Sequence, residues 1–183
     1  LTGRLARLKD ADFRSRLLAG RPEGRGPFSK VYFVTFDKMF VLGDPPDYEP
    51  LPETSIGAIA RERGMDPAEL ALQLMEEGGG KGLIYYPLAN YAEGSLEPSL
   101  EMMKHPNTLM GLSDGGAHVG TICDGSFPTS MLTHWTRDRS RGSKLSLPWA
   151  IRAYSSEAAQ AVGLNDRGVI GMARSQDPNS ANS

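Results

Sequence analysis

Cysteine is nearly absent from this sequence, since its 183 residues contain only Cys123. A single cysteine excludes an intrachain disulfide framework and is typical of the reducing cytoplasm. Positive charge is not in excess, because 20 basic residues stand against 22 acidic ones, so no nucleic-acid partner is indicated. No apolar run approaches the ~20 residues of a membrane-spanning helix. We therefore expect a cytoplasmic chain that has neither nucleic acid nor a membrane as its partner.

Histidine is also scarce, with only His105, His118 and His134 in the chain. His105 precedes a proline in a connecting loop and is expected to be exposed, whereas His134 falls in a predicted helix and is expected to be structural. Cys123 is either a soft metal ligand or, as we expect, a packed thiol. Together with Asp114, these side chains do not have zinc-finger spacing.

The stretch Gly111–His118 carries the strongest indication of chemistry. The apolar run Thr108–Leu112 predicts a short buried strand, and Gly115 and Gly116 allow a sharp turn after it. This turn leaves Asp114 at the carboxyl edge of the strand, where α/β enzymes place their reactive groups. A carboxylate there can ligate a metal ion, act as a general base, or do both. The alternative is an Asx-turn, in which Asp114 only hydrogen-bonds the backbone of its own loop.

The longer segment 112–128, LSDGGAHVGTICDGSFP, resembles the amidohydrolase superfamily, specifically its N-acyl-D-amino-acid deacylase (D-aminoacylase-like) branch. The resemblance runs from about Val31 to Ile170. It implies a (β/α)8 TIM barrel whose eighth strand ends at Asp114. It also implies that Asp114 contacts a catalytic zinc ion and transfers the proton of the attacking water. We expect His118 to bind substrate at the mouth of the pocket, and a loop histidine bonded to nearby backbone is the alternative.

The resemblance further implies that this chain is a piece of a larger enzyme, because a whole barrel needs roughly 250 residues. Family members also use paired histidines after the first strand, a cysteine or carboxylated lysine on the fourth, and histidines ending the fifth and sixth. None of these can be placed here, so we expect the isolated chain to be inactive. The predicted fold class is α/β, the C-terminal part of a TIM barrel that starts near strand seven. Residues 1–170 form the partial metal-dependent hydrolase domain, residues 164–170 resemble the point where a small β-sandwich resumes, and residues 171–183 are expected to be a disordered or foreign tail.

The run Val31–Phe36 is the clearest strand before residue 80 and would be the seventh strand of the barrel. Tyr32 in this run is a candidate substrate contact, and a packing tyrosine is the alternative. Family deacylases often hold the substrate carboxylate with an arginine about a dozen residues after the aspartate. Here no arginine occurs between Asp114 and Arg137. The identity of the substrate as an acyl-D-amino acid is therefore undecided, whereas the assignment to the hydrolase class is unaffected.

Helices are predicted from apolar periodicity and from capping residues. Ser55 is expected to cap a helix over Ile56–Arg63 that Gly64 ends, and Asp66 is expected to start the next helix. In the first half, we also expect a helical segment over 1–19 in which Asp10 caps a second part, and a helix after Asp66 that buries Leu70, Ala71, Leu74 and Met75 and ends at Gly78–Gly80. A strand over 82–86 and a helix opened by Ser95 follow. The last two expected helices are 129–139, with Met131, Leu132 and Trp135 inward, and 147–162, with Ala150, Ala153, Tyr154, Ala158 and Ala161 packed and Gly163 at its end.

Two functions of different classes follow. The first is a zinc-dependent amidohydrolase that acts on a small acylated amine or amide substrate and is present here without the N-terminal part of its barrel. The second is a non-catalytic α/β fragment, which associates with itself or with a partner through exposed barrel edges. The metal content of the purified chain separates the two.

Overall fold

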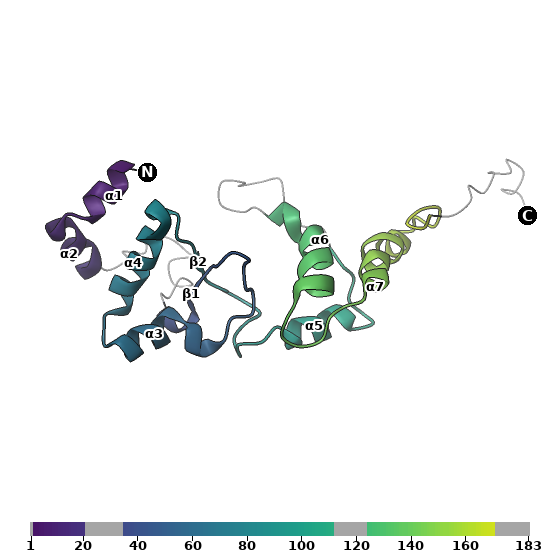
Figure 1. The fold of residues 1–183 in the computed structure, drawn as a ribbon. Coiled ribbons are helices and arrows are strands. Elements are labelled where there is room, and N and C mark those ends of the chain that lie inside the picture. The colour runs from purple at the N-terminus through teal and green to yellow at the C-terminus, as the bar shows by residue number, and fades with distance from the viewer. Residues whose placement is uncertain (1, 21–34, 112–123, 171–183) are drawn as a thin grey trace, which may run out of the picture. The chain divides into compact units, whose positions relative to one another are not determined.

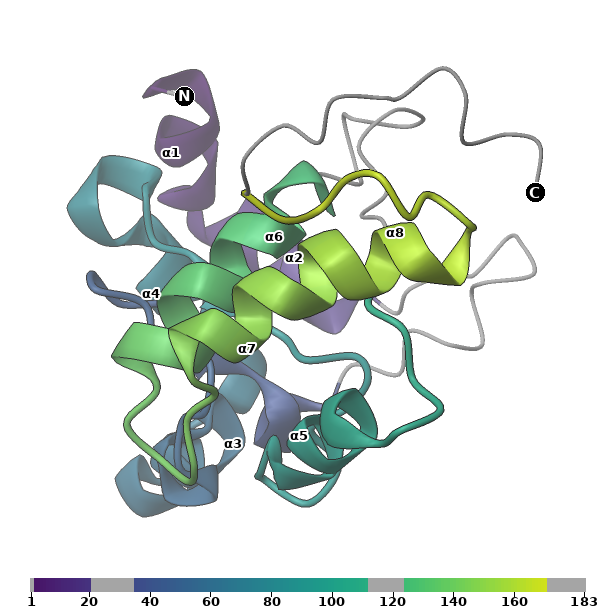
Figure 2. The ribbon, with the colours of Figure 1, turned by 90° about the vertical axis from the view of Figure 1, so that its right-hand side faces the viewer.

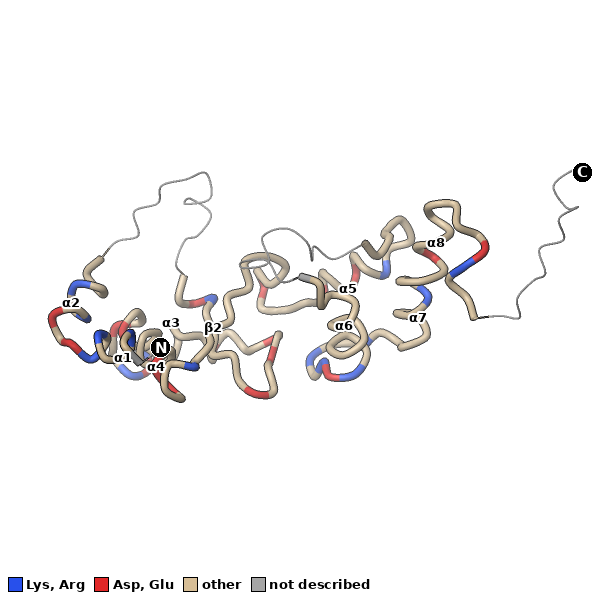
Figure 3. The backbone as a smooth tube through the Cα atoms, turned by 90° about the horizontal axis from the view of Figure 1, so that it is seen from above, with Lys and Arg blue, Asp and Glu red and all other residues tan. Residues whose placement is uncertain are grey.

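The structure is a computed structural model that describes residues 2–20, 35–111 and 124–170. The chain divides into two compact units, Leu1–Leu96 and Glu97–Ser183, and each is described by itself. Basic and acidic residues are interspersed along the described part of both units (Figure 3). Among the described residues, no helix is long and apolar enough to cross a membrane.

The first unit begins with two short helices, α1 (Thr2–Leu8) and α2 (Ala11–Ala19), shown in purple in Figure 1. The carboxylate of Asp10 accepts a hydrogen bond of 2.7 Å from the N–H of Phe13, which confirms the predicted cap between them. Arg14 of α2 then donates to Glu69 at 2.6 Å and to Glu76 at 2.8 Å. This arginine therefore attaches α2 to the helix that carries both glutamates.

The next two helices, α3 (Ile56–Arg63) and α4 (Pro67–Gly80), have the predicted boundaries. Ser55 Oγ caps α3 and Gly64 ends it with a φ of +63°, a left-handed conformation that glycine adopts without steric cost. Asp66 caps α4 by accepting from two backbone N–H groups. The α4 backbone departs from helical angles at Glu77, Gly78 and Gly79, which matches the expected helix end.

The core of the first unit joins α3 to α4. Its fully buried members are Ile56, Ala60, Leu70 and Ala71. The predicted buried face of α4 needs one correction, because Met75 is exposed and Leu72 is buried in its place. Both residues lie at the margin of the apolar stripe, where neighbouring segments decide which side chain is covered.

Of the three strands predicted from the sequence, one is observed within the described residues and two are not. Strand β2 (Ile84–Tyr85) lies within the predicted strand 82–86, but it pairs antiparallel with β1 (Phe40–Val41), which had not been predicted. In the described part of the chain this two-stranded sheet is the sheet observed, so the barrel expected from the sequence is not seen.

Neither predicted barrel strand is formed in its described part. Thr35 has no regular structure and Phe36 begins the 3₁₀ turn η1 (Phe36–Lys38), while residues 31–34 lie outside the described residues. Residues 108–111 are also irregular. The physical reason is that a parallel barrel strand takes its backbone hydrogen bonds from strands on both edges, and no described segment pairs with either run.

The regular secondary structure in the described part of the second unit is entirely helical. The cluster Leu100, Met131, Leu145 and Ala150 forms its core, with Trp135, Trp149 and Tyr154 packed against it. The segments η4 and α7 lie side by side, and α7, η5 and α8 follow one another as one continuous helix (Figure 2). The bounds are α5 (Glu97–Lys104), η3 (Asp124–Ser126), α6 (Phe127–Ser130), η4 (Met131–Asp138), α7 (Leu147–Arg152), η5 (Ala153–Glu157) and α8 (Ala158–Ala161).

Predictions for the second unit are confirmed at Met131, Ala150 and Ala153, which are buried. They are wrong at Leu132 and Ala161, which are exposed. One cause is that the helix over 129–139 is α-helical only in α6 and continues as the π-helix η4, so residues past Ser130 no longer follow the α-helical spacing.

Hydroxyl side chains accompany both π-helical segments. Thr133 donates to the carbonyl of Thr129 at 3.0 Å, and Thr136 donates to that of Leu132 at 2.5 Å. In the second such region, Ser155 donates to the carbonyl of Ile151 at 2.6 Å. Each hydroxyl competes for the carbonyl four residues back, which weakens the α-helical ladder and favours the wider turn.

A buried arginine links the parts of the second unit. Arg139 directly follows the last residue of η4, and its side chain is 0% exposed. Its guanidinium lies 4.9 Å from the ring centre of Trp135, 3.0 Å from Glu97 Oε1 and 2.5 Å from the carbonyl of Ser143. This one side chain therefore ties η4 to the start of α5 and to the loop before α7.

An apolar groove of about 850 Å³ runs along α7 and the segment after α8. We call it the C-terminal groove. Its lining comprises Leu147, Pro148, Ile151, Arg152, Ser155, Ser156, Gly168, Val169 and Ile170.

Candidate functional site

The residues that the sequence assigns to catalysis and substrate binding lie outside the described residues. These are Asp114, His118 and Tyr32, and Cys123 lies outside them too. Their roles therefore stay predictions. In the described ranges 2–20, 35–111 and 124–170, no three His, Cys, Asp or Glu side chains come together as a metal site.

The other two histidines are described. His105 is exposed in the turn after α5, as predicted, and its Nδ1 accepts a hydrogen bond from the N–H of Asn107. His134 packs edge-on against the ring of Trp135 at 5.4 Å, in agreement with the structural role expected from its place in a helix.

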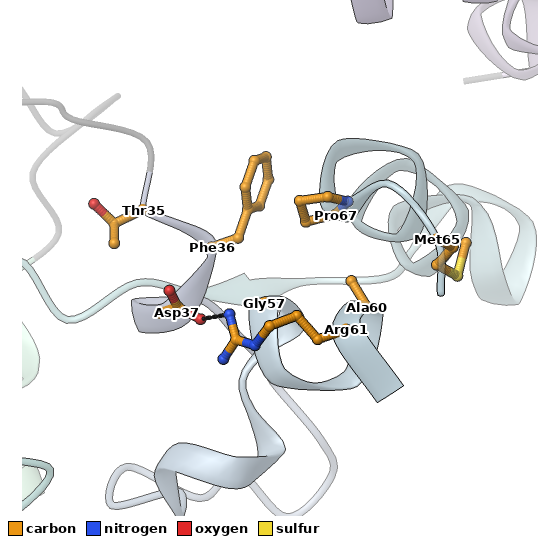
Figure 4. A pocket seen from close by; sticks show the side chains of 8 residues that line it. All are labelled: Thr35, Phe36, Asp37, Gly57, Ala60, Arg61, Met65 and Pro67. Atoms are coloured by element: carbon orange, nitrogen blue, oxygen red, sulfur yellow. Dashed lines mark hydrogen bonds and ion pairs between the residues drawn. The ribbon is translucent and has the colours of Figure 1, made fainter. Parts of the chain in front are cut away.

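The first unit contains a cavity of about 260 Å³ between η1, the start of α3 and the first turn of α4. We call it the α3 cavity. Two stretches that are distant in sequence build it, and its lining, shown in Figure 4, comprises Thr35, Phe36, Asp37, Gly57, Ala60, Arg61, Met65 and Pro67.

Most of the lining of the α3 cavity is apolar. Phe36 faces Pro67 across the cavity, and Ala60 and Met65 complete this surface (Figure 4). Ala60 is buried in the core of the first unit, and Phe36 and Met65 pack against that core. The apolar wall is thus a continuation of the core and is held by it.

An ion pair provides the polar part of the cavity. Arg61 Nη1 donates to Asp37 Oδ1 at 2.6 Å, and the two side chains are 67% and 57% exposed. A pair this accessible to water contributes under about 1 kcal/mol to stability. Its main effect is to hold a donor and an acceptor side by side at the edge of an apolar surface.

Gly57 allows the close approach on which this arrangement depends. A Cβ at residue 57 would collide with Asp37 Oδ1 and would lie 2.9 Å from the backbone nitrogen of Asp37. The first turn of α3 is further tied to the preceding segment by a hydrogen bond of 2.8 Å from the N–H of Ile56 to the carbonyl of Met39. Only glycine leaves room for the Asp37 side chain beside the start of this helix.

The sequence contained a signal for Asp37 that had not been used. Asp37 follows the apolar run Val31–Phe36 directly, as Asp114 follows the apolar run Thr108–Leu112 after one residue. The rule that α/β enzymes place reactive groups at strand ends applies to both aspartates. Arg61 carried no such signal, because it lies on a helix and 24 residues further along the chain.

A second polar cluster joins the segment before the 3₁₀ turn η2 (Pro52–Thr54) to the end of the first unit. Glu49 is 2% exposed, and its Oε1 accepts from the N–H of Leu96 at 3.1 Å. The hydroxyl of Tyr91 donates to the carbonyl of Pro50 at 2.7 Å. Burial, and then the negative charge of neighbouring ionised groups, raises the pKa of Tyr85. The cluster holds two irregular segments together.

Comparisons with known proteins give the family. The profile of the amidohydrolase family matches residues 35–174. Curated relatives include uncharacterized proteins of Mycobacterium tuberculosis and Mycobacterium bovis, each 29% identical over 113 residues. Those residues are 60% of this chain and 18% of each relative, so the match covers about a fifth of the relatives' length. No solved structure matches the chain. Since the matched residues make up well over half of the sequence, the chain belongs to the amidohydrolase family.

Proposed function

We propose that this chain is the C-terminal part of the (β/α)8 barrel of an N-acyl-D-amino-acid deacylase-like amidohydrolase, which hydrolyses a C–N amide bond. The observation that carries the proposal is the family match over residues 35–174. This match includes the segment 112–128, in which Asp114 follows an apolar run after one residue and precedes a pair of glycines. The small acylated amine or amide is the proposed substrate class.

A divalent metal is typical of the family, and we propose zinc. Catalytic zinc sites use about three protein ligands, and no described group of side chains provides them. Asp114 is the one residue of this chain proposed to contact the ion. When bound, zinc would polarise the scissile carbonyl and lower the pKa of a water molecule.

Asp114 is proposed to act as the general base and then as the general acid. Its carboxylate would accept a proton from the attacking water and deliver it to the leaving amine, which would otherwise depart as an unstable anion. His118, four residues further on, and Tyr32 in the run 31–36 are proposed to contact the substrate. Because the family's other metal ligands cannot be placed in this sequence and the described residues contain no group of three, we propose that the chain is inactive without the rest of the barrel.

The experiment compares Asp114→Asn with Asp124→Asn in the full-length protein that contains this chain. Asp124 lies ten residues further along the same glycine-rich segment and has no proposed role. Asparagine keeps the size of the side chain but cannot accept the proton, so kcat should fall on the order of a hundredfold or more for Asp114→Asn. Asp124→Asn should retain kcat. Near-wild-type turnover by Asp114→Asn would reduce this residue to a turn residue.

A further inference from the structure

The α3 cavity combines a small apolar surface with one fixed pair of polar groups. Its volume of about 260 Å³ is smaller than the 300–1,000 Å³ of pockets for drug-sized ligands. The apolar part is formed by Phe36, Ala60, Met65 and Pro67, and the polar part by Asp37 and Arg61. A ligand of this cavity is therefore small and has an apolar group next to a polar one.

The ion pair leaves hydrogen-bonding capacity on both partners. Arg61 uses Nη1 to donate to Asp37 Oδ1, and within the described residues the other oxygen, Oδ2, accepts no hydrogen bond. A guanidinium has five N–H donors, and a carboxylate has two acceptor oxygens. The pair thus presents an acceptor and several donors at neighbouring positions.

The charges of the pair select among ligands. A carboxylate would gain the Arg61 guanidinium but would stand beside the Asp37 carboxylate, and an ammonium group would gain Asp37 but stand beside Arg61. In each case one attraction is offset by one repulsion of like charges. A neutral amide avoids both repulsions, because its N–H can donate to Asp37 Oδ2 while its carbonyl accepts from Arg61.

The pair is also held in place before a ligand arrives. Gly57 leaves the space that Asp37 occupies against the first turn of α3, and Arg61 is one helical turn further along the same helix. Groups fixed in advance lose less entropy on binding. We propose that the α3 cavity is a binding site for a small neutral amide that has an aliphatic group, with Asp37 as acceptor, Arg61 as donor and the wall of Phe36, Met65 and Pro67 around the aliphatic part.

The experiment is an NMR titration of the whole 183-residue chain with three matched probes. Isovaleramide, isovalerate and isoamylamine share their branched aliphatic part and carry a neutral, a negative and a positive head. Isovaleramide should shift the backbone resonance of Gly57 and the side-chain Nε–H of Arg61 saturably. The dissociation constants of the two ions should be at least about tenfold higher.

Two arginine variants provide the control. Arg61→Met removes the donors and should weaken isovaleramide binding at least about tenfold, whereas Arg63→Met, an exposed arginine of the same helix outside the cavity, should leave it unchanged. Far-UV circular dichroism checks that both variants are folded. The proposal is overturned if isovaleramide gives no saturable shift, if the ions bind as well, or if the two variants behave alike. Binding is read without turnover or metal, so these outcomes are separate from those for Asp114→Asn.

Discussion

Replacing Arg139 with methionine should destabilise the second unit more than any other single arginine substitution in its described part. Methionine keeps an apolar stem of similar length but removes the charge and all donors. The lost interactions are the hydrogen bond to the Ser143 carbonyl, the contact with the Trp135 ring and the pair with Glu97. Because the Arg139 side chain is 0% exposed, water does not replace these interactions in the folded state.

The structure allows an estimate of the loss. A hydrogen bond from a charged group contributes about 1.5–3 kcal/mol, and a desolvated cation over an aromatic ring about 2 kcal/mol. The Glu97 side chain is 44% exposed, so its pairing contributes under about 1 kcal/mol. These contributions overlap and methionine recovers some packing, so we expect a total loss of about 3 kcal/mol.

Urea unfolding followed by tryptophan fluorescence measures this loss in the second unit alone, since both tryptophans, Trp135 and Trp149, belong to it. With a slope of about 1.5 kcal/mol per molar, a loss of about 3 kcal/mol lowers the midpoint by about 2 M urea. Arg137→Met is the matched control, because Arg137 is 69% exposed and its ion pair with Asp138 is also exposed, so the midpoint should stay close to that of the unchanged protein. Equal midpoints for the two variants would refute the role of Arg139.

Three further predictions concern single contacts and surfaces. Gly82→Ala should destabilise the first unit by about 1–3 kcal/mol in urea unfolding, because the added Cβ collides with the α4 backbone, whereas Gly3→Ala, with open space around it, should be neutral or slightly stabilising. The Arg14 hydrogen bond lowers the pKa of Glu69, so this attachment is present above the ordinary glutamate pKa and is lost as the pH falls through the lowered value. Protection factors in α2, which are corrected for the intrinsic exchange rate, should therefore fall as the pH is lowered below the ordinary glutamate pKa, and Glu69→Gln should remove this pH dependence. The isolated chain should self-associate through apolar surface such as the C-terminal groove, which light scattering across a dilution series and binding of a hydrophobic dye test. Ile151→Lys should reduce both self-association and dye binding. A monodisperse monomer that binds no dye would contradict the prediction.

The helix boundaries could be predicted because capping is local. Asp10, Ser55 and Asp66 each accept a hydrogen bond from a backbone N–H two or three residues away, and Gly64 ends its helix through its own backbone conformation. A window of a few residues contains all the information that such a boundary needs. The order of α1 to α4 and the N-caps of α2, α3 and α4 were therefore predicted correctly.

Burial and the candidate site depend on contacts between distant segments. Arg139 is buried because Trp135, Glu97 and Ser143 surround its guanidinium, and Glu97 is 42 residues away in a different helix. The pairing of Asp37 with Arg61 likewise joins a turn to a helix. Periodicity assigns a residue to a face of its own helix but does not show what covers that face. The burial and pairing of side chains that contact a different helix or loop were therefore not predicted from the sequence.

Strands are the extreme case of this dependence, because a strand has no hydrogen-bonded backbone of its own. The run Thr108–Leu112 has the apolar composition of a buried strand, yet the N–H of Thr108 donates to the carbonyl of His105 in the turn that follows α5. The predicted strand 82–86 does find a partner, since Phe40 and Val41 pair with Tyr85 and Ile84 and the N–H of Leu42 continues the ladder to Leu83. The composition of a segment shows that it is able to form a strand, but the strand forms only when a neighbouring segment pairs with its backbone hydrogen-bonding groups. In the proposed barrel the run Thr108–Leu112 would pair on one edge with the predicted seventh strand, Val31–Phe36, and on the other with the first strand of the barrel. The formation of regular structure at residues 108–111 in the full-length protein is therefore the direct physical consequence of the proposal.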